Sequence, residues 1–208
     1  MIEVELKARL RDRKATEARV ASFAAYVGPV DKFDSYWHGP DWRLQRGTKG
    51  FRLRAEDGST LVTFKTKRSE GGIEINRERE FGISDPDIFV EFCLRLGCEP
   101  FYTKRKRGSK YRADPCSDGA RQEIPLAASG RRTAGNCPGA ATIEIIEVED
   151  LGDFIEIEIL LEDEDPGAVA LAQGEIRGLL SRAGVPESDL EPRFYSELLT
   201  AAGKVPRP

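Results

Sequence analysis

The sequence predicts an α+β fold built on an antiparallel sheet that is large enough to close into a barrel. Segments in which apolar and charged residues alternate recur along the chain, as in strands with two unlike faces. Asp-Gly and Gly-Gly pairs separate several of these segments at hairpin spacing, which is typical of antiparallel neighbours. Two Asp-Pro pairs mark the starts of helices between them. About eight strands and four helices are expected.

The elements follow in order from local signals. Residues 2–9 alternate strictly and predict the first strand, and the Ala-rich residues 14–27 have helical spacing that Gly28-Pro29 ends. The other strands are expected at residues 30–37, 50–56, 60–67, 73–81, 101–112, 143–148 and 153–161. The other helices are expected at residues 85–97, 165–183 and 193–202. Residues 39–50 and 113–141 are rich in Gly and Arg without a period, so both are expected to be loops, the longer one mobile.

Composition narrows the class of protein. A chain of 208 residues is long enough for one domain with a substantial core. With 32 basic and 36 acidic residues the net charge is −4, which argues against a nucleic-acid binder that works through a positive surface. No apolar run approaches the roughly 20 residues of a membrane span and no signal-peptide pattern is present, so we expect a soluble, cytoplasmic protein without membrane contact. The four cysteines lack zinc-site spacing, and the single histidine, His38, has no catalytic partner near it in sequence.

The charges on the expected strands come in pairs of one sign, two residues apart. Members of such a pair share one face of a strand. The pairs are Glu3 and Glu5, Arg52 and Arg54, Lys65 and Lys67, Glu78 and Glu80, Arg105 and Arg107, and Glu156 and Glu158. One interpretation is a sheet whose charged face is solvated. The other is a barrel with a charged interior, in which the bases bind phosphate oxygens and the carboxylates hold Mg²⁺ or Mn²⁺. The spacing of the charges does not decide between the two.

Several segments resemble the CYTH superfamily, the triphosphate tunnel metalloenzymes. The hallmark of this superfamily is a Glu-x-Glu-x-Lys strand at the N-terminus, which corresponds here to Glu3, Glu5 and Lys7. Similar segments follow in the order Asp34-Ser35-Tyr36, Phe51-Arg52-Leu53-Arg54, Thr63-Phe64-Lys65, residues 77–80, the basic strand around residues 105–107, and residues 151–158 and 195–199. The similarity covers nearly the whole chain except residues 113–141, and residues 151–158 look most like the class IV adenylyl cyclase branch.

The resemblance implies that residues 1–208 form a single domain, an eight-stranded antiparallel barrel that is open at its ends and binds a triphosphate in a charged interior. The metal ligands would be Glu3, Glu5, Glu156 and Glu158. The phosphates would be held by Lys7, Arg52, Arg54, Lys65, Arg105 and Arg107, and catalysis would involve Lys7, Arg52, Lys65 and Glu144. Glu78 and Glu80 match interior acids that orient the bases. A shift of one residue in the register of the basic strand would exchange Arg105 and Arg107 for Lys104 and Lys106.

One position departs from the family pattern. The cyclase-like branch has an aspartate five residues before the Leu-Gly turn, where this chain has Ile146, and Glu144 on the same strand face could take its place. Three functions remain open. The first is a class IV adenylyl cyclase-like enzyme that makes cyclic AMP and pyrophosphate from ATP. The second is a hydrolase of thiamine triphosphate, inorganic triphosphate or a nucleoside triphosphate. The third is a protein that binds polyphosphate without turnover. A monomer or homodimer is expected, with substrate specificity resting on the loops at 39–50 and 113–141.

Overall fold

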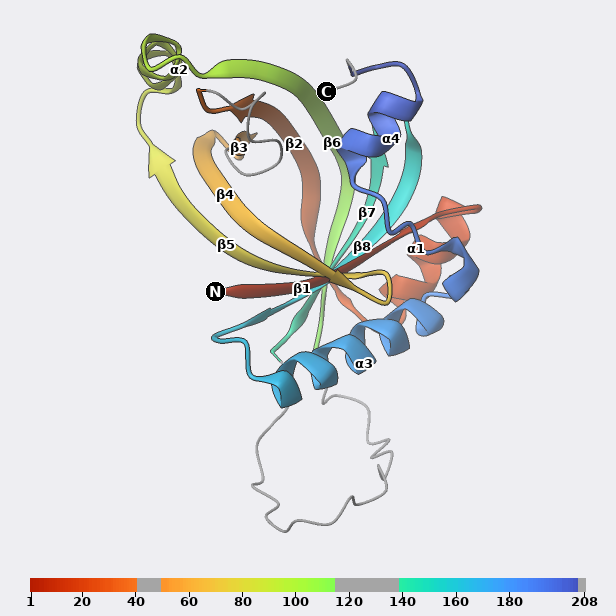
Figure 1. The fold of residues 1–208 in the computed structure, drawn as a ribbon. Coiled ribbons are helices and arrows are strands. Elements are labelled where there is room, and N and C mark those ends of the chain that lie inside the picture. Colours follow the sequence, from red (N-terminus) through yellow and green to blue (C-terminus); the bar gives the residue numbers. More distant parts are fainter. Residues whose placement is uncertain (41–49, 115–138, 206–208) are drawn as a thin grey trace.

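Eight strands form a closed barrel in the part of the chain that the computed structural model describes, residues 1–40, 50–114 and 139–205. Their order around the barrel is β1-β5-β4-β3-β2-β6-β7-β8, and neighbouring strands are antiparallel (Figure 1). The expected α+β fold with an antiparallel barrel is therefore confirmed. The strands are β1 (Ile2–Arg9), β2 (Ala25–His38), β3 (Gly50–Glu56), β4 (Ser59–Glu70), β5 (Ile73–Ile83), β6 (Glu99–Ala113), β7 (Ala141–Val148) and β8 (Gly152–Leu161).

Helices flank the barrel and connect its strands. They are α1 (Arg13–Ala21), α2 (Pro86–Arg95), α3 (Pro166–Arg182) and α4 (Tyr195–Ala201), with a short 3₁₀ helix at Glu187–Asp189. Over the described ranges, no helix is both long enough and apolar enough to cross a membrane. The loops predicted at residues 39–50 and 113–141 fall largely on residues 41–49 and 115–138, which lie outside the described residues.

Local chemistry explains where the hairpins and helices begin. Asp57 and Gly58 connect β3 to β4 with φ angles of 51° and 74°, the left-handed conformation that a two-residue hairpin turn requires. Asp85 and Asp165 each accept a hydrogen bond from a backbone N–H three residues later, at 3.0 and 2.8 Å. These bonds cap α2 and α3, and each helix then starts with a proline, as the Asp-Pro pairs predict.

The first helix is shorter than the sequence predicts. Helical spacing predicts a helix over residues 14–27, but α1 ends at Ala21 and the chain enters β2 at Ala25. Residues 25–27 lie beside the end of β6, with Tyr26 opposite Tyr111, so cross-strand pairing overrides the helix preference of this Ala-rich segment. Gly28-Pro29 lies within β2, where the register with β6 shifts and a proline is tolerated.

The main hydrophobic core lies outside the barrel, between its wall and α3. Outward-facing Leu6, Ile143 and Ile157 pack with Ile176 and Leu179 of α3, and each of the five is no more than 1% exposed. Figure 1 shows α3 lying along the outside of the barrel next to β1 and β8. Because the apolar faces of these strands point outward to the helix, their polar faces must point into the barrel.

Candidate functional site

Charged side chains from all eight strands of the described barrel line an interior cavity of about 1140 Å³. The basic residues are Lys7, Lys32, Arg52, Arg54, Lys65, Lys104 and Lys106. The acidic residues are Glu3, Glu5, Glu74, Glu78, Glu80, Glu144, Glu156 and Glu158. Four of the six charged doublets, those at residues 3 and 5, 52 and 54, 78 and 80, and 156 and 158, therefore face an interior instead of forming a solvated outer face.

Strand β1 shows how the alternating pattern builds this cavity. Glu3, Glu5 and Lys7 face the interior, and Glu3 and Lys7 are only 7% and 4% exposed. Lys7 Nζ donates to Glu74 Oε1 of β5 at 2.7 Å. Buried charges require such partners because desolvation is costly. Glu74 is four residues before Glu78 and so lies on the same face of β5. The alternation of the strand could therefore have identified Glu74 as an interior residue.

The basic strand β6 has the opposite register from the one the resemblance implied. Arg105 and Arg107 lie on the outside, where Arg105 forms a bidentate pair with exposed Asp31 at 2.8 and 2.7 Å. The expected interior position of Arg105 and Arg107 is therefore wrong. Lys104 and Lys106 line the cavity instead and are 5% and 6% exposed. Both faces of this strand are basic, so alternation alone cannot distinguish them.

Strand β2 contributes a polar cluster to the cavity. The search for charged doublets in the sequence missed it, because its members are not two charges of one sign. Buried Asp34 accepts hydrogen bonds from Arg54 Nε and Nη2 at 2.7 and 3.0 Å, and Lys104 Nζ lies 3.2 Å away. Burial alone would raise the pKa of Asp34, but the Lys104 and Arg54 cations hold it well below its usual range. Lys32 and Tyr36 lie two residues before and after Asp34, so all three share one face of the strand. This cluster could therefore have been predicted from the sequence.

Glu3 is held as an anion by neighbours on β4 and β5. Lys65 Nζ and Asn76 Nδ2 donate to Glu3 Oε2 at 3.0 and 2.9 Å. Burial by itself would raise the pKa of Glu3, but the Lys65 ammonium and these hydrogen bonds lower it to about 2. The side chain of Lys67, the doublet partner of Lys65, lies outside what the structure describes.

Arg52 reaches from β3 across β4 to β5 on the cavity wall. Its Nη2 donates to Thr63 Oγ1 and Glu78 Oε1, both at 3.1 Å, and Glu80 Oε1 is 3.5 Å away. Glu78 and Glu80 thus orient a base, in agreement with the role that the resemblance implied. The Arg52 Nε–H is buried and has no acceptor among the described groups. An anion in the cavity would supply that acceptor.

Helix α4 inserts Tyr195 into the same cavity. The Tyr195 hydroxyl donates to Glu156 Oε1 at 2.7 Å. Its ring centroid lies 5.5, 4.6 and 5.1 Å from the ammonium groups of Lys7, Lys104 and Lys106. Lys106 Nζ also donates to Glu156, at 2.7 Å. Burial opposes ionisation of Glu156, but Lys106, Lys104 and Tyr195 hold its pKa below the usual range. Strand alternation gave no indication of this contribution, because Tyr195 comes from a separate helix.

Glu5 and Glu158 are directly opposite each other on β1 and β8. Among the described side chains, neither carboxylate has a cation within 4 Å. Burial and the carboxylates of neighbouring Glu3, Glu156 and Glu74 raise the pKa of Glu5 to about 7. Burial, Glu3, Glu5 and Glu144 raise the pKa of Glu158 to about 8. Two half-buried carboxylates that repel each other are suited to a hard divalent cation, which prefers oxygen ligands.

The four expected metal ligands are thus divided into two pairs. Among the side chains that the structure describes, Glu3 and Glu156 are paired with lysines, whereas Glu5 and Glu158 are not. No three acidic, His or Cys side chains in the described ranges are grouped closely enough to hold a metal ion as they stand. The donor types fit Mg²⁺ or Mn²⁺, and Glu3 or Glu156 could add a further carboxylate only by giving up its bond to lysine.

The position of the expected aspartate is apolar. Ile146 is fully buried and packs with Val30, Phe154 and Tyr195. Glu144, the candidate replacement, does line the cavity, but Lys32 Nζ donates to its Oε1 at 2.6 Å and Lys110 lies 3.6 Å away. This carboxylate is therefore shared between two lysines.

Comparison with known proteins agrees with this geometry. The CYTH domain model matches residues 1–195. A Methanocaldococcus jannaschii protein with the provisional name adenylate cyclase is 22% identical over 199 residues, 95% of this chain and 98% of its own.

Two solved structures share the fold. A Pyrococcus horikoshii OT3 protein has 26% identity and a TM-score of 0.68, with 96% of this chain and 98% of that chain covered. The Hippeastrum protein HpAC1, named an adenylyl cyclase and described as having a dominant triphosphatase activity, has 18% identity and a TM-score of 0.59, with 97% and 96% covered. The chain belongs to the CYTH domain family, whose members bind triphosphates and use divalent metals.

Proposed function

We propose that this protein is a divalent-metal-dependent enzyme that processes a triphosphate, with the conversion of ATP to cyclic AMP and pyrophosphate as the first candidate reaction. One observation carries the proposal. Basic side chains from five different strands converge on one cavity that also holds two half-buried carboxylates, Glu5 and Glu158, without a cation among the described residues. A triphosphate with a metal ion would neutralise both groups of charges at once.

The charge pairs suggest how the two ligands bind together. In the protein alone, Lys65 is paired with Glu3 and Lys106 with Glu156. Phosphate oxygens would compete with these carboxylates for the lysines. Glu3 and Glu156 would then be released to join Glu5 and Glu158 as metal ligands. Binding of triphosphate and of metal should therefore be cooperative, each strengthening the other by the same factor.

The residues of the chain position the substrate and neutralise its charge. Lys7, Arg52, Lys65, Lys104 and Lys106 would hold phosphate oxygens, and the Arg52 Nε–H provides an unused donor for one of them. The metal, held by Glu5 and Glu158 with Glu3 or Glu156, would supply positive charge at the reacting phosphate. Positioning and charge neutralisation account for most of the catalysis of phosphoryl and nucleotidyl transfer, so no nucleophilic side chain is required.

In the cyclase reaction, the 3′-oxygen of ATP bonds to the α-phosphorus, the bond from that phosphorus to the bridging oxygen breaks, and pyrophosphate leaves. The hydroxyl proton is released. In the alternative reaction, water attacks the terminal phosphorus, and a diphosphate and phosphate leave. The second candidate is supported by the triphosphatase activity described for the similar Hippeastrum protein and by apolar Ile146 at the position of the expected aspartate.

Chromatography of all products tests the proposal. The protein would be incubated with ATP, thiamine triphosphate and inorganic triphosphate, each with Mg²⁺ or Mn²⁺ and with EDTA as a control. Cyclic AMP and pyrophosphate support the cyclase, and phosphate with a diphosphate supports the hydrolase. Binding of a triphosphate without any product would show a binding protein and overturn the enzymatic proposal. Glu158→Gln, which removes a carboxylate that has no lysine partner in the described structure, should abolish metal-dependent turnover.

A further inference from the structure

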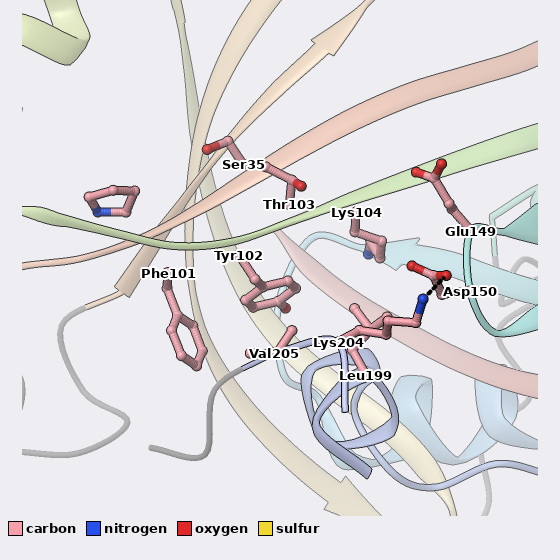
Figure 2. Close-up of a pocket in the computed structure, with 11 residues that line it drawn as sticks. Ser35, Phe101, Tyr102, Thr103, Lys104, Glu149, Asp150, Leu199, Lys204 and Val205 are labelled. Atoms are coloured by element: carbon pink, nitrogen blue, oxygen red, sulfur yellow. Dashed lines mark ion pairs between the residues drawn. The ribbon is translucent and has the colours of Figure 1, made fainter. Parts of the chain in front are cut away.

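A second cavity adjoins the charged interior. It has a volume of about 470 Å³ and lies between the beginning of β6, the β7–β8 turn and the end of the C-terminal helix (Figure 2). Phe101, Tyr102 and Lys104 line both cavities, so the two meet at these three side chains. The smaller cavity also has apolar walls from Leu199 and Val205. We refer to it below as the side pocket.

A β-bulge places the aromatic rings at this junction. On β2 and β6, Tyr36 is opposite Tyr102 and Trp37 is opposite Pro100, so Phe101 is the extra residue that shifts the register between the two strands. In a regular strand, Phe101 and Tyr102 would point to opposite faces. Figure 2 shows both side chains on the same side of β6, with Thr103 on the other side. Bulges commonly redirect side chains next to binding sites.

The rings form a continuous aromatic surface. Tyr36 and Tyr102 are stacked with centroids 4.3 Å apart and planes at 6°. The Phe101 ring stands at 82° to Tyr102, with centroids 5.1 Å apart, and His38 lies 4.4 Å from Phe101. All four side chains are half-buried, neither enclosed in the core nor fully exposed. A planar group can lie against such rings through stacking, and the Lys204–Asp150 ion pair at 2.7 Å provides a polar edge.

The aromatic surface begins where the phosphate-binding lysines end. Lys104 Nζ donates to the Tyr36 hydroxyl at 3.0 Å and lies 5.3 Å from the centre of its ring. From Lys104 to Tyr102 the strand advances by two residues, roughly 7 Å. This separation suits a molecule whose phosphates bind the lysines and whose ring is attached through a short linker.

We propose that Phe101 and Tyr102 bind the planar aromatic group of the substrate at the junction with the side pocket. The inference rests on the proposed function and narrows its substrate class to triphosphate esters that carry a ring, such as nucleoside triphosphates. Inorganic triphosphate has no group to place against these rings. Specificity then depends on the bulge in β6, in addition to the loops predicted at residues 39–50 and 113–141.

Calorimetric titration of the full chain with ATP and with inorganic triphosphate tests the inference. Phe101→Ala should weaken ATP binding about tenfold, the usual effect of removing a ring that stacks on a base. Inorganic triphosphate should bind within about twofold of its affinity for the unmodified protein. Phe101→Leu keeps an apolar side chain without a ring and should show the same difference. Phe33→Ala is the matched control, because Phe33 is 42% exposed and lines neither cavity. Chromatography of each sample verifies that the ligand remains intact.

The outcomes separate the two proposals. Equal weakening of both ligands by Phe101→Ala would show that the ring only shapes the tunnel, and would overturn the inference. An unchanged affinity for ATP would overturn it as well. If the unmodified protein binds neither ATP nor inorganic triphosphate, the proposed function fails, and the inference that rests on it fails too.

Discussion

Removal of one positive charge from either face of β6 is the most informative perturbation. Lys106→Gln removes a cation from the cavity, whereas Arg105→Gln removes one from the outer face of the same strand. The two positions are adjacent in sequence, and both substitutions delete one positive charge. Any difference in triphosphate binding therefore reports the direction in which the side chain points.

The contacts of Lys106 give the expected size of the effects on triphosphate affinity and on stability. A charge-assisted hydrogen bond contributes about 1.5–3 kcal/mol, so the loss of Lys106 should raise the Kd for a triphosphate roughly 10- to 150-fold. The substitution also affects stability, because Lys106 is 6% exposed and pairs with buried Glu156. Breaking such a pair costs about 3–5 kcal/mol, and the lower end applies here because Tyr195 and Lys104 still stabilise the carboxylate. For a protein of this size, about 3 kcal/mol corresponds to a Tm decrease of roughly 6–12 °C.

Isothermal titration with inorganic triphosphate, together with thermal unfolding, measures both effects. Titrations are carried out well below the lowest Tm, so that each variant is folded. Arg105→Gln should match the unmodified protein in both measurements, since its partner Asp31 is exposed. Equal weakening by the two substitutions, or weakening by Arg105→Gln alone, would refute the assignment of the β6 register.

Three further predictions concern other parts of the site and the core. Tyr195→Phe removes the hydroxyl that donates to Glu156 and should lower the free energy of unfolding by about 1.5–3 kcal/mol, measured by urea denaturation. Mn²⁺ binding should strengthen as the pH rises through the range of about 7 to 8, because Glu5 and Glu158 have raised pKa values of about 7 and about 8 and must lose their protons to bind a metal. Calorimetry in buffers of different ionisation enthalpy would count the released protons. Ile176→Ala should lower the free energy of unfolding by about 2–5 kcal/mol, because this fully buried side chain joins α3 to the barrel wall.

Each of these predictions has a clear contrary result. A Tyr195→Phe variant as stable as the unmodified protein would show that Glu156 does not depend on this hydroxyl. Mn²⁺ affinity that stays constant across the range, without proton release, would exclude Glu5 and Glu158 as ligands with raised pKa values. A loss below about 1 kcal/mol for Ile176→Ala would mean that α3 does not form the main core.

The elements of the fold could largely be predicted because their signals are local. The Asp57-Gly58 turn and the Asp85 and Asp165 caps act within a few residues of themselves, and all three occur where the sequence predicts them. The prediction of a helix over residues 14–27 was wrong at its C-terminal end because a distant segment, and not a local signal, decides the structure there. Its last residues belong to β2 because β6, which comes much later in the chain, lies beside them.

The sequence by itself determined which residues share a strand face, because side chains alternate with a period of two wherever one face is apolar. Ile2, Val4 and Leu6 had to face a core, so Glu3, Glu5 and Lys7 had to face the other way. On β6 both faces are charged, and only its pairing with β2 and β7 turns Lys104 and Lys106 inward.

Tertiary structure alone also decided which charges become partners. Strand alternation places carboxylates in the interior, but closure of the barrel pairs Glu3 with Lys65 and leaves Glu5 opposite Glu158. Tyr195 enters from a helix that lies far from the barrel strands in sequence. These relations depend on distances between separate segments, and such distances exist only after the chain has folded.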